Sequence, residues 1–340
     1  MAWFNNKLPI KFHLPEIIKG PWTREARQMA LDREVLEHYI EYFGRAMQFR
    51  NWSPWHNFPL DEMRQWGQKL SQETFHLIDG FLGVEEYVGD YVMEGLEMFR
   101  DNRTRRNMQL QWGAEEAKHG LSWELVLKHS LGRTEEQLKT YLNKVREYRW
   151  SVKQHPGADS PLGVTAYAMV QERATFFNYQ EMRARVREEY GVPTNPTPEE
   201  QSRGCEVGAS EAFRVVALDE IAHHTIFLKI VQSHVKYFPS MTFEVLSSVF
   251  KGFDMPAFRF IPNARRFILT LGRTGFNTVA MYREKVHNPV LKSLGLENHE
   301  AFDKAVQLAR KLPENLGPDI VKLSRTGEWV MGFSQAPSAM

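Results

Sequence analysis

The sequence predicts an all-α protein: a helix bundle with a metal-binding core and additional flanking helices. Segments with apolar residues at helical spacing follow one another between residue 23 and about residue 312. Strand signals are nearly absent, because no Asn-Gly or Asp-Gly pair stands between two alternating apolar runs. Four glutamates and two histidines recur in an order that four packed helices would bring to one centre.

The composition favours one globular unit. Of 340 residues, 42% are hydrophobic and 25% are charged, and the formal net charge is +1, which argues against disorder and against nucleic acid as a partner. Cys205 is the one cysteine, which excludes a disulfide framework and fits a reducing compartment. No apolar run approaches the ~20 residues of a membrane span, and residues 1–20 lack the apolar centre of a signal peptide. We therefore expect a cytoplasmic protein with no transmembrane segment, folded as a single domain over residues 1–340.

Capping and turn residues divide the N-terminal half into elements. Residues 1–22 are expected to form an irregular arm, because prolines interrupt them. Gly132 supplies a C-terminal stop for a long helix, and Thr134 supplies the N-cap of the next one, which opens with Thr-Glu-Glu-Gln. Helices are expected at 23–49, 61–79, 84–100 and 103–130, with a proline-bounded loop at 51–59.

The helix expected at 162–190 is the most informative element of the C-terminal half. It follows a loop at 154–160 and is apolar nearly all round in its first half, which predicts a central position. The tail beyond Leu312 is expected to pack loosely. We therefore place the helical core at 23–290 and a peripheral helix and tail at 291–340. Further helices are expected at 198–236, 241–253, 256–270, 275–287 and 298–312.

Two Glu-x-x-His steps, each preceded by a Glu in an earlier helix, define the candidate site. The i, i+3 spacing puts both side chains on one face of a helix, about one turn apart. Two helical hairpins packed face to face would bring both sets to one centre, as the ligand set of a carboxylate-bridged two-metal site. In chain order the residues are Glu85, Glu116 and His119, then Glu172, Glu220 and His223.

Other polar residues are expected to have ordinary roles. The pairs Glu73/His76 and Glu284/His287 also have the Glu-x-x-His spacing. The first runs into Asp79-Gly80 and the second into Pro289, both expected helix ends, which predicts solvated surface pairs. The basic residues between 100 and 106 are expected to form a solvated face. Glu86, Glu115 and His224, which adjoin proposed ligands, are expected to be outer partners of the site or surface groups.

The residue types at this centre suit redox-active iron. Iron that binds dioxygen and cycles between its ferrous and ferric states prefers carboxylate oxygens with some imidazole. Each histidine would keep its second ring nitrogen for an outer partner, and Asp219, directly before Glu220, is a candidate. Thr175 follows Glu172 by three residues, which turns its hydroxyl toward the same centre. The sequence therefore indicates an oxygen-activating enzyme.

These motifs resemble those of the soluble acyl-ACP desaturases. Residues 112–120, Trp-Gly-Ala-Glu-Glu-Ala-Lys-His-Gly, are similar to the family's Trp-Thr-Ala-Glu-Glu-Asn-Arg-His-Gly. Residues 171–176 match its Gln-Glu-Arg-Ala-Thr-Phe, and residues 219–223, Asp-Glu-Ile-Ala-His, resemble its Asp-Glu-Lys-Arg-His. The residues alone leave Glu85 and Glu86 open as the first ligand. Glu85-Glu86 with Tyr91 resembles the family's run in which the first Glu binds the metal, and this resemblance selects Glu85. The similarity extends from about residue 50 to about residue 260.

The resemblance implies a ferritin-like helix bundle and a di-iron acyl-ACP desaturase of fatty acid biosynthesis. Such an enzyme uses O2 and two electrons, usually from a ferredoxin, to remove two hydrogens from an acyl chain on acyl carrier protein. Thr175 would lie beside the oxygen-binding face, and Trp52 and Asp219 would relay electrons toward iron through the first histidine. A homodimer and a bent apolar tunnel for the acyl chain are also implied. The two Fe ions would be held by Glu85, Glu116, His119, Glu172, Glu220 and His223.

The chain also departs from the family pattern. Lys118 and Ala222 stand where the plant enzymes have arginine, and the connection between Glu172 and Glu220 is longer. The sequence lacks a transit peptide, so we expect a bacterial member. Acyl chain length and double-bond position do not carry over.

Two other functions stay open at this point. A di-iron hydroxylase or N-oxygenase, acting on a carrier-bound or small-molecule substrate, would use the same six ligands. A non-catalytic metal-binding protein of the ferritin or rubrerythrin type belongs to a different class. Such proteins are usually shorter, and rubrerythrins carry a cysteine-rich module that this chain lacks.

Overall fold

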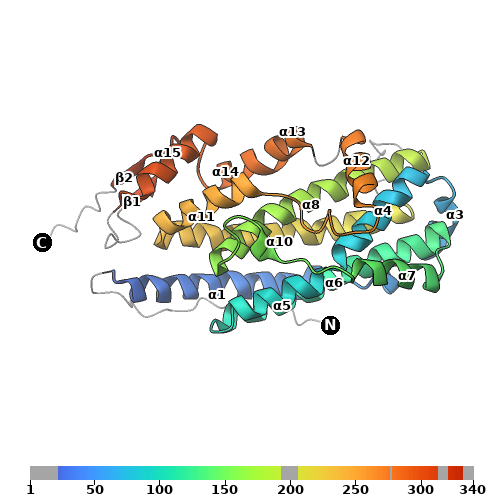
Figure 1. The fold of residues 1–340 in the computed structure, drawn as a ribbon. Coiled ribbons are helices and arrows are strands. Elements are labelled where there is room, and N and C mark those ends of the chain that lie inside the picture. Colours follow the sequence, from blue (N-terminus) through green and yellow to red (C-terminus); the bar gives the residue numbers. More distant parts are fainter. Residues whose placement is uncertain (1–21, 193–205, 276–277, 313–320, 332–340) are drawn as a thin grey trace, which may run out of the picture.

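The computed structural model describes residues 22–192, 206–275, 278–312 and 321–331. Long helices run nearly side by side along the molecule (Figure 1). The most extensive helix contact joins α8 and α10, and α6 packs against both α4 and α10. The predicted all-α bundle is therefore confirmed. Its four central helices are α4 (Gln72–Glu85), α6 (Arg103–Leu131), α8 (Pro161–Tyr190) and α10 (Ala209–Tyr237).

Further helices flank this centre on two sides. The long helix α1 (Arg24–Phe49) packs on α10 and α6, and α5 (Val88–Met98) packs on α6. Along the opposite side lie α11 (Pro239–Gly252) and α14 (Asn288–Ser293) (Figure 1). Other elements outside the four central helices are α2 (Pro54–Asn57), α3 (Leu60–Gly67), α7 (Glu135–Val145), the short 3-10 turn η1 (Val152–Gln154) and α15 (His299–Ala309).

Capping residues act where the sequence predicts them. Gly132 ends α6 in the left-handed conformation with φ of 70°, which glycine adopts at little cost. The Thr134 hydroxyl accepts from the backbone N–H of Gln137, and the Gln137 side chain accepts from the Thr134 N–H, so the two form a capping box at α7. The predicted start of α1 and end of α6 are confirmed.

The helix expected at 61–79 is divided, and this prediction was wrong. The helix is interrupted after α3. The Ser71 side chain then caps α4 by accepting a hydrogen bond from the Thr74 backbone N–H over 3.1 Å. Helix α4 then passes through Gly80 and ends at Glu85, so the helix expected at 84–100 begins only at Val88. Gly80 does not end the helix. A Cβ on it would lie 2.2 Å from the Phe267 ring, so the glycine permits close packing of α12 (Ala264–Arg273).

The predicted helix boundaries after residue 255 also need correction. Residues 255–263 form turns, with positive φ at Ala257 and Asn263, and α12 starts only after them. The following helix continues past Pro289, because α13 (Val279–Met281) leads into the π-helical turn η2 (Tyr282–His287) and then α14. Proline lacks the N–H that an α-helix needs, and a wider π turn before it relaxes that requirement.

The tail contains a short hairpin that the sequence did not predict. Strands β1 (Val321–Leu323) and β2 (Trp329–Met331) pair antiparallel, and the Trp329 ring packs 5.5 Å from that of Phe243. The expectation of a loosely packed tail is wrong for this segment. Three-residue strands are too short for an alternating pattern to be read. The expected arm at 1–22 lies outside the described residues except for residue 22. The segment 193–205, where the helix expected at 198–236 would begin, also lies outside them. In the described part, that helix starts at Ala209.

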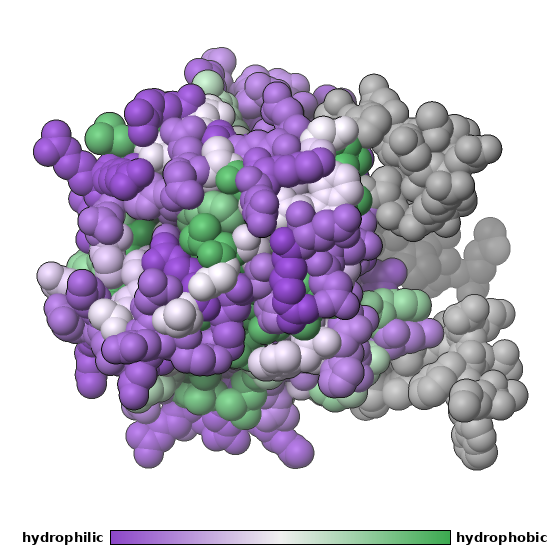
Figure 2. Space-filling view, turned by 90° about the vertical axis from the view of Figure 1, so that its right-hand side faces the viewer, coloured by the Kyte–Doolittle hydropathy of each residue, from purple (hydrophilic) through white to green (hydrophobic). Residues whose placement is uncertain are grey.

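The core is continuous around the central helices. Trp123, Tyr179 and Phe213 are fully buried, with the Trp123 ring 4.5 Å from Phe213 and 4.9 Å from Tyr179. Figure 2 views the end of the molecule that lies on the right in Figure 1, and that face is mainly hydrophilic with small hydrophobic groups. No helix in the described part of the chain is long and apolar enough to cross a membrane.

Candidate metal centre

The four central helices bring the six predicted ligand residues into one buried cluster. Two sets of four residues have ligand atoms within 4.8 Å of one another, and the sets share Glu116 and Glu220. The sharing is typical of glutamates that lie between two neighbouring metal ions. The first set is completed by Glu85 and His119 and the second by Glu172 and His223.

The i, i+3 spacing on α6 places Glu116 and His119 on one face of the helix, as predicted. Nδ1 of His119 lies 3.2 Å from Oε2 of Glu116, one turn earlier on the same helix, and 3.3 Å from Oε1 of Glu220 on α10. Nδ1 of His223 lies 2.6 Å from Oε1 of Glu116. Both histidines therefore point the same ring nitrogen at the cluster, and Glu116 presents one oxygen to each of them.

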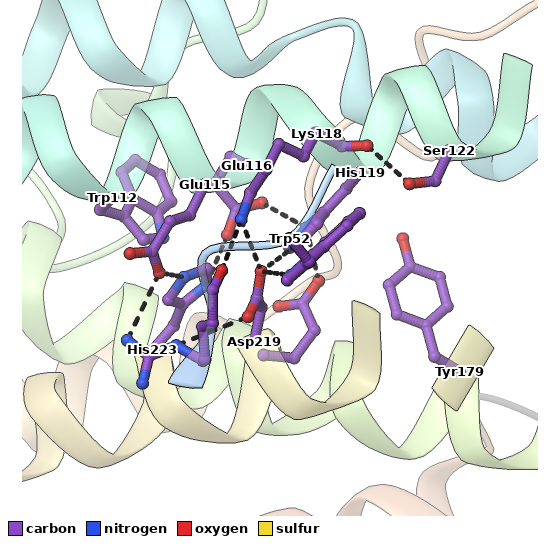
Figure 3. Close-up of polar contacts among 12 residues, drawn as sticks. Trp52, Trp112, Glu115, Glu116, Lys118, His119, Ser122, Tyr179, Asp219 and His223 are labelled. Carbon is purple, nitrogen blue, oxygen red and sulfur yellow. Dashed lines mark hydrogen bonds and ion pairs between the residues drawn. The ribbon is translucent and has the colours of Figure 1, made fainter. Parts of the chain in front are cut away.

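The other ring nitrogen of each histidine faces an outer carboxylate. Nε2 of His223 lies 2.9 Å from Oε2 of Glu115, and Nε2 of His119 lies 3.5 Å from Oδ2 of Asp219 (Figure 3). Carboxylates in this position fix the tautomer and orientation of a metal-binding histidine. The sequence predicted this place for Asp219 and left Glu115 open between an outer partner and a surface group.

Trp52 joins the His119 side of the site. Its indole N–H donates to Oδ2 of Asp219 over 2.9 Å, and its ring is nearly parallel to the His119 ring at 6.4 Å (Figure 3). Lys118 contacts both, with Nζ 3.4 Å from Oδ2 of Asp219 and 4.3 Å from the Trp52 ring centre. The structure thus gathers Trp52, Asp219 and His119 into one continuous contact.

Four further residues contact the cluster that sequence reasoning did not single out. Trp112 donates its indole N–H to Oε1 of Glu172 over 3.1 Å, and the Tyr179 hydroxyl donates to Oε1 of Glu85. Each stands one or two helical turns from a proposed ligand on the same helix, so spacing could have found them. The other two, Tyr42 and Arg50, come from α1 and its end, and no local signal relates them to the site.

Burial and mutual charge perturb the titration of the cluster. Burial, with the nearby Glu116 charge, raises the pKa of Glu85 to about 8, and burial raises the pKa of Glu220 well above its usual value. Burial alone would raise the pKa of Glu116, but the charges of His119 and His223 hold it below its usual range. The protein alone therefore stores protons among these groups, and a bound cation would displace them.

The polar atoms that face the centre fit a metal. They are buried and lie within ion-pair distance of one another, but none makes a hydrogen bond of normal geometry in the described part of the chain: Oε1 of Glu116, Nδ1 of His119, Oε2 of Glu172, Oε1 of Glu220 and Nδ1 of His223. Burying such atoms unpaired is costly, and cations between them would satisfy all five. Carboxylate oxygens with two imidazoles are a donor set for iron, manganese or zinc.

A small cavity adjoins the cluster on the side of Thr175. Glu85, Glu116 and Glu220 line it together with Thr175 and Asn178, and apolar side chains complete the wall. Its volume is about 10 Å³, which is room for about one water molecule. Asn178 is fully buried, and neither its amide oxygen nor its amide nitrogen has a partner among the described residues. The Thr175 hydroxyl donates to the Gln171 carbonyl over 3.1 Å.

Two predictions of surface positions were wrong, those for Arg105 and His287. Arg105 is buried, donates to the Thr165 hydroxyl and lies 4.2 Å from the Phe99 ring centre, while its basic neighbours are exposed. His287 is buried against Phe250 at 5.0 Å, because the helix continues past Pro289. For His224 the sequence left an outer partner and a surface group open; it is buried and pairs through Nδ1 with the Met169 carbonyl at 2.7 Å.

This fold and cluster define a class of protein: helix bundles with a carboxylate and histidine site of two-metal geometry. The chain belongs to the fatty acid desaturase family, whose sequence pattern it matches over residues 60–330. It resembles the solved structure of the putative acyl-ACP desaturase DesA2 from Mycobacterium tuberculosis H37Rv with a TM-score of 0.54 at 14% identity, covering 79% of this chain and 96% of that one. At this identity the likeness concerns the fold. No curated protein matches the chain significantly.

Proposed function

We propose that this protein is an O2-dependent di-iron acyl-ACP desaturase that introduces a double bond into a saturated acyl chain. The observation that carries the proposal is the pair of four-residue sets that share Glu116 and Glu220, in a chain of the fatty acid desaturase family. The reaction balances when an acyl CH2–CH2 unit, O2, two electrons and two protons give CH=CH and two waters. The six clustered residues are the proposed iron ligands.

The side chains around this centre have different proposed roles. Two iron ions would supply the oxidising power that removal of hydrogen from an unactivated methylene requires. Glu116 and Glu220, which belong to both sets, would hold the ions together with the other four clustered residues, and Glu115 and Asp219 would keep the rings of His223 and His119 in place. Burial of the whole cluster excludes bulk water from the reacting groups.

Electrons would enter on the Trp52 side. The contact from Trp52 through Asp219 to His119 supports this route, because it links a partly exposed ring to a proposed ligand. A ferredoxin-type protein is the proposed donor. Thr175 lies on the wall of the cavity beside three of the carboxylates, which supports its proposed place at the oxygen-binding face.

The acyl chain would bind in the region of that cavity, which must enlarge first. A space of about 10 Å³ does not admit an acyl chain. Phe81, Val84, Met255 and Phe258 form its apolar wall. The last two lie at the start of the irregular 255–263 segment, which is free of regular helical hydrogen bonding. We propose that movement of this segment opens the tunnel that the family resemblance implies.

A homodimer and a cytoplasmic location belong to the same proposal. Support for the dimer comes from one face of α1, where four apolar side chains are 39–57% exposed at spacings of seven, seven and four residues. Such a stripe is typical of a surface that another protein covers. Its residues are Met29, Leu36, Phe43 and Met47.

The mass of the product tests the proposed function. Iron-loaded protein would be incubated with air, a ferredoxin reducing system and a panel of saturated acyl carrier proteins. We expect one acyl chain to lose two hydrogens, which would also identify the substrate length. A matched reaction with the Glu116→Ala variant should leave the chain unchanged.

Other results would replace the proposal. Gain of one oxygen atom would assign the protein as a hydroxylase with the same ligands. Oxygenation of an amine substrate would assign it as an N-oxygenase. Bound iron with no product across carrier-bound and free substrates would assign a metal-binding role without catalysis.

A further inference from the structure

Arg50 lies outside the four ligand-bearing helices but reaches both sides of the centre. It follows α1 directly as the C-cap residue. Its Nη2 lies 3.5 Å from Oε2 of Glu115, and its Nε lies 3.5 Å from Oδ1 of Asp219. The Arg50 side chain is 12% exposed, and the two carboxylates are 4% and 1% exposed. Charges this far from water interact more strongly than surface pairs do.

These two carboxylates are the ones that face the metal-site histidines. Glu115 approaches Nε2 of His223 and Asp219 approaches Nε2 of His119. Arg50 therefore completes a chain of contacts from one histidine to the other, around the outside of the cluster. Among the described residues, no other basic side chain has ion-pair contacts with both carboxylates.

The residues next to the histidines make this role specific to this chain. Lys118, directly before His119, reaches Asp219 at 3.4 Å. The corresponding residue before His223 is Ala222, which carries no charge. In the described part of the chain, the only Lys or Arg with an ion-pair contact to Glu115 is therefore Arg50. A guanidinium can address two carboxylates with separate N–H groups, and a lysine ammonium offers one point charge.

The position of Arg50 is itself fixed by several contacts. Its guanidinium lies 4.9 Å from the ring centre of Tyr42, and Tyr42 donates its hydroxyl to Oε2 of Glu115 over 2.8 Å. The Arg50 carbonyl accepts from Nζ of Lys118 over 3.1 Å, and its N–H donates to the Ala46 carbonyl. A cavity of about 100 Å³ opens beside it, lined in part by Ala222.

We propose that Arg50 is a positioning residue that couples the two metal-binding halves of the site by holding Glu115 and Asp219, and through them His223 and His119. The inference rests on the proposed two-iron function. It assigns to one residue an effect on both ions, whereas Lys118 serves the His119 half and Tyr42 the His223 half.

Ferrous iron titrated into metal-free protein without oxygen tests this role. Binding would be followed by equilibrium dialysis, which resolves a stronger and a weaker site, and helix content by circular dichroism. We expect Arg50→Gln to weaken both binding steps by about 10- to 100-fold, the loss typical when an outer partner of a ligand is removed. Lys118→Met and Tyr42→Phe should each weaken one step and leave the other unchanged.

Arg45→Gln is the matched control. Arg45 stands on α1 five residues earlier and is 65% exposed, and Glu41 is its one ion-pair partner among the described residues. Iron binding should therefore stay at the wild-type level. Arg50→Ala should regain both steps when methylguanidine is added, because the adjoining cavity lets a small guanidinium enter. A residue needed only for folding would not respond to methylguanidine.

The outcomes separate this inference from the proposed function. Wild-type protein that binds two ferrous ions, with an Arg50→Gln variant that binds them equally well or loses one step alone, would overturn the role of Arg50 and leave the di-iron site intact. Wild-type protein that binds no iron would overturn both. If Arg50→Gln does not fold, Arg50→Lys decides: we expect it to weaken one step, and two wild-type steps would overturn the coupling.

Discussion

Oε2 of Glu115 lies 2.9 Å from Nε2 of His223, although 108 residues separate them in the chain. The opposite contact joins Asp219 to His119, so α6 and α10 each supply the outer carboxylate for the histidine of the other helix. Adjacent helical residues point about 100° apart. An acid directly before each of the two glutamates that the sets share therefore points out of the cluster and toward the neighbouring helix.

Removal of Glu116 should abolish turnover. Glu116 faces both histidines, so we expect Glu116→Ala to lower activity more than about 100-fold, beyond the loss typical for outer partners of ligands. Iron content should fall in parallel while circular dichroism keeps most of the helical signal. Glu124→Ala is the control, since Glu124 lies on the same helix and, among the described residues, has its one ion-pair contact with Lys128 at 4.0 Å. Full turnover in Glu116→Ala would show that the assigned centre is wrong.

Glu85 and Glu86 can be separated by a matched pair of variants. Glu85 is buried in the cluster, and Glu86 pairs with Arg146 near the surface. We expect Glu85→Gln to lower iron affinity at least about tenfold. Glu86→Gln should lose only a surface ion pair, worth about 0–1 kcal/mol. Iron titration checks both, and a larger loss in Glu86→Gln would transfer the ligand role to that residue.

Thr175 should affect the use of oxygen more than the binding of iron. It lines the cavity beside three carboxylates, but its hydroxyl donates to the Gln171 carbonyl and to none of these carboxylates. We expect Thr175→Val to bind wild-type amounts of iron and to form less product for each O2 consumed. Parallel measurement of oxygen uptake and product checks this ratio. Thr175→Ser, which keeps the hydroxyl, should stay close to wild type, and an unchanged ratio in Thr175→Val would remove Thr175 from this role.

The six clustered residues could be predicted from sequence because helical spacing is local and repeated. Glu116 and His119 lie one turn apart on α6, and this relationship depends on no other part of the chain. The boundaries after residue 255 could not be predicted in the same way. A proline normally ends a helix, but Pro289 stands in the first turn of α14, directly after a π-helical turn, where its missing N–H is tolerated.

Contacts between segments that are distant in the chain could not be predicted from the sequence for a related reason. Arg50 and Tyr42 lie on or next to α1, and nothing in their local pattern distinguishes them from other residues of an amphipathic helix. Gly80 was wrongly interpreted as a helix end. The sequence alone does not distinguish a glycine that ends a helix from one that allows close packing, as Gly80 does against Phe267. Tertiary packing, which the local pattern does not contain, decides between these possibilities.

Close approach of α3 to α6 should make Gly67 sensitive to substitution. A Cβ at Gly67 would lie 2.1 Å from the backbone oxygen of Ser130, so Gly67→Ala forces the helices apart. We expect a loss of about 1–3 kcal/mol in the free energy of unfolding. Gly89→Ala on α5 is the control, because nothing lies within 4 Å of its Cβ. In Gly89→Ala, the higher helix propensity of alanine should raise the free energy of unfolding by up to about 1 kcal/mol. Denaturant unfolding measures both, and equal changes would exclude the steric explanation.

The stability of the metal-free protein should fall as pH rises between about 5 and 8. Burial raises the pKa of Glu85 to about 8 from its usual 4.5, so in this range the folded state holds a proton that the unfolded chain has lost. A state that binds more protons is destabilised, relative to the other, as pH increases. Burial lowers the pKa of both histidines, but Glu116 raises that of His119, and Tyr42 with Glu116 raises that of His223, to well above the usual value. These groups therefore act in the same direction above pH 6.5.

Melting temperatures of metal-free protein at pH 5.5, 6.5, 7.5 and 8 check this dependence, with the Glu85→Gln variant as the comparison. We expect the wild-type value to decline across the series and the variant to decline less, because glutamine has no proton to release. Glu115, whose pKa is lowered to about 2 chiefly by its pairing with His223 against the effect of burial, contributes stability that is lost only in acid, below this range. Ferrous iron should flatten the wild-type profile, because the ions bind the ionised carboxylates and replace the stored protons. A metal-free profile that rises from pH 5.5 to 8 would mean that the cluster does not hold these protons.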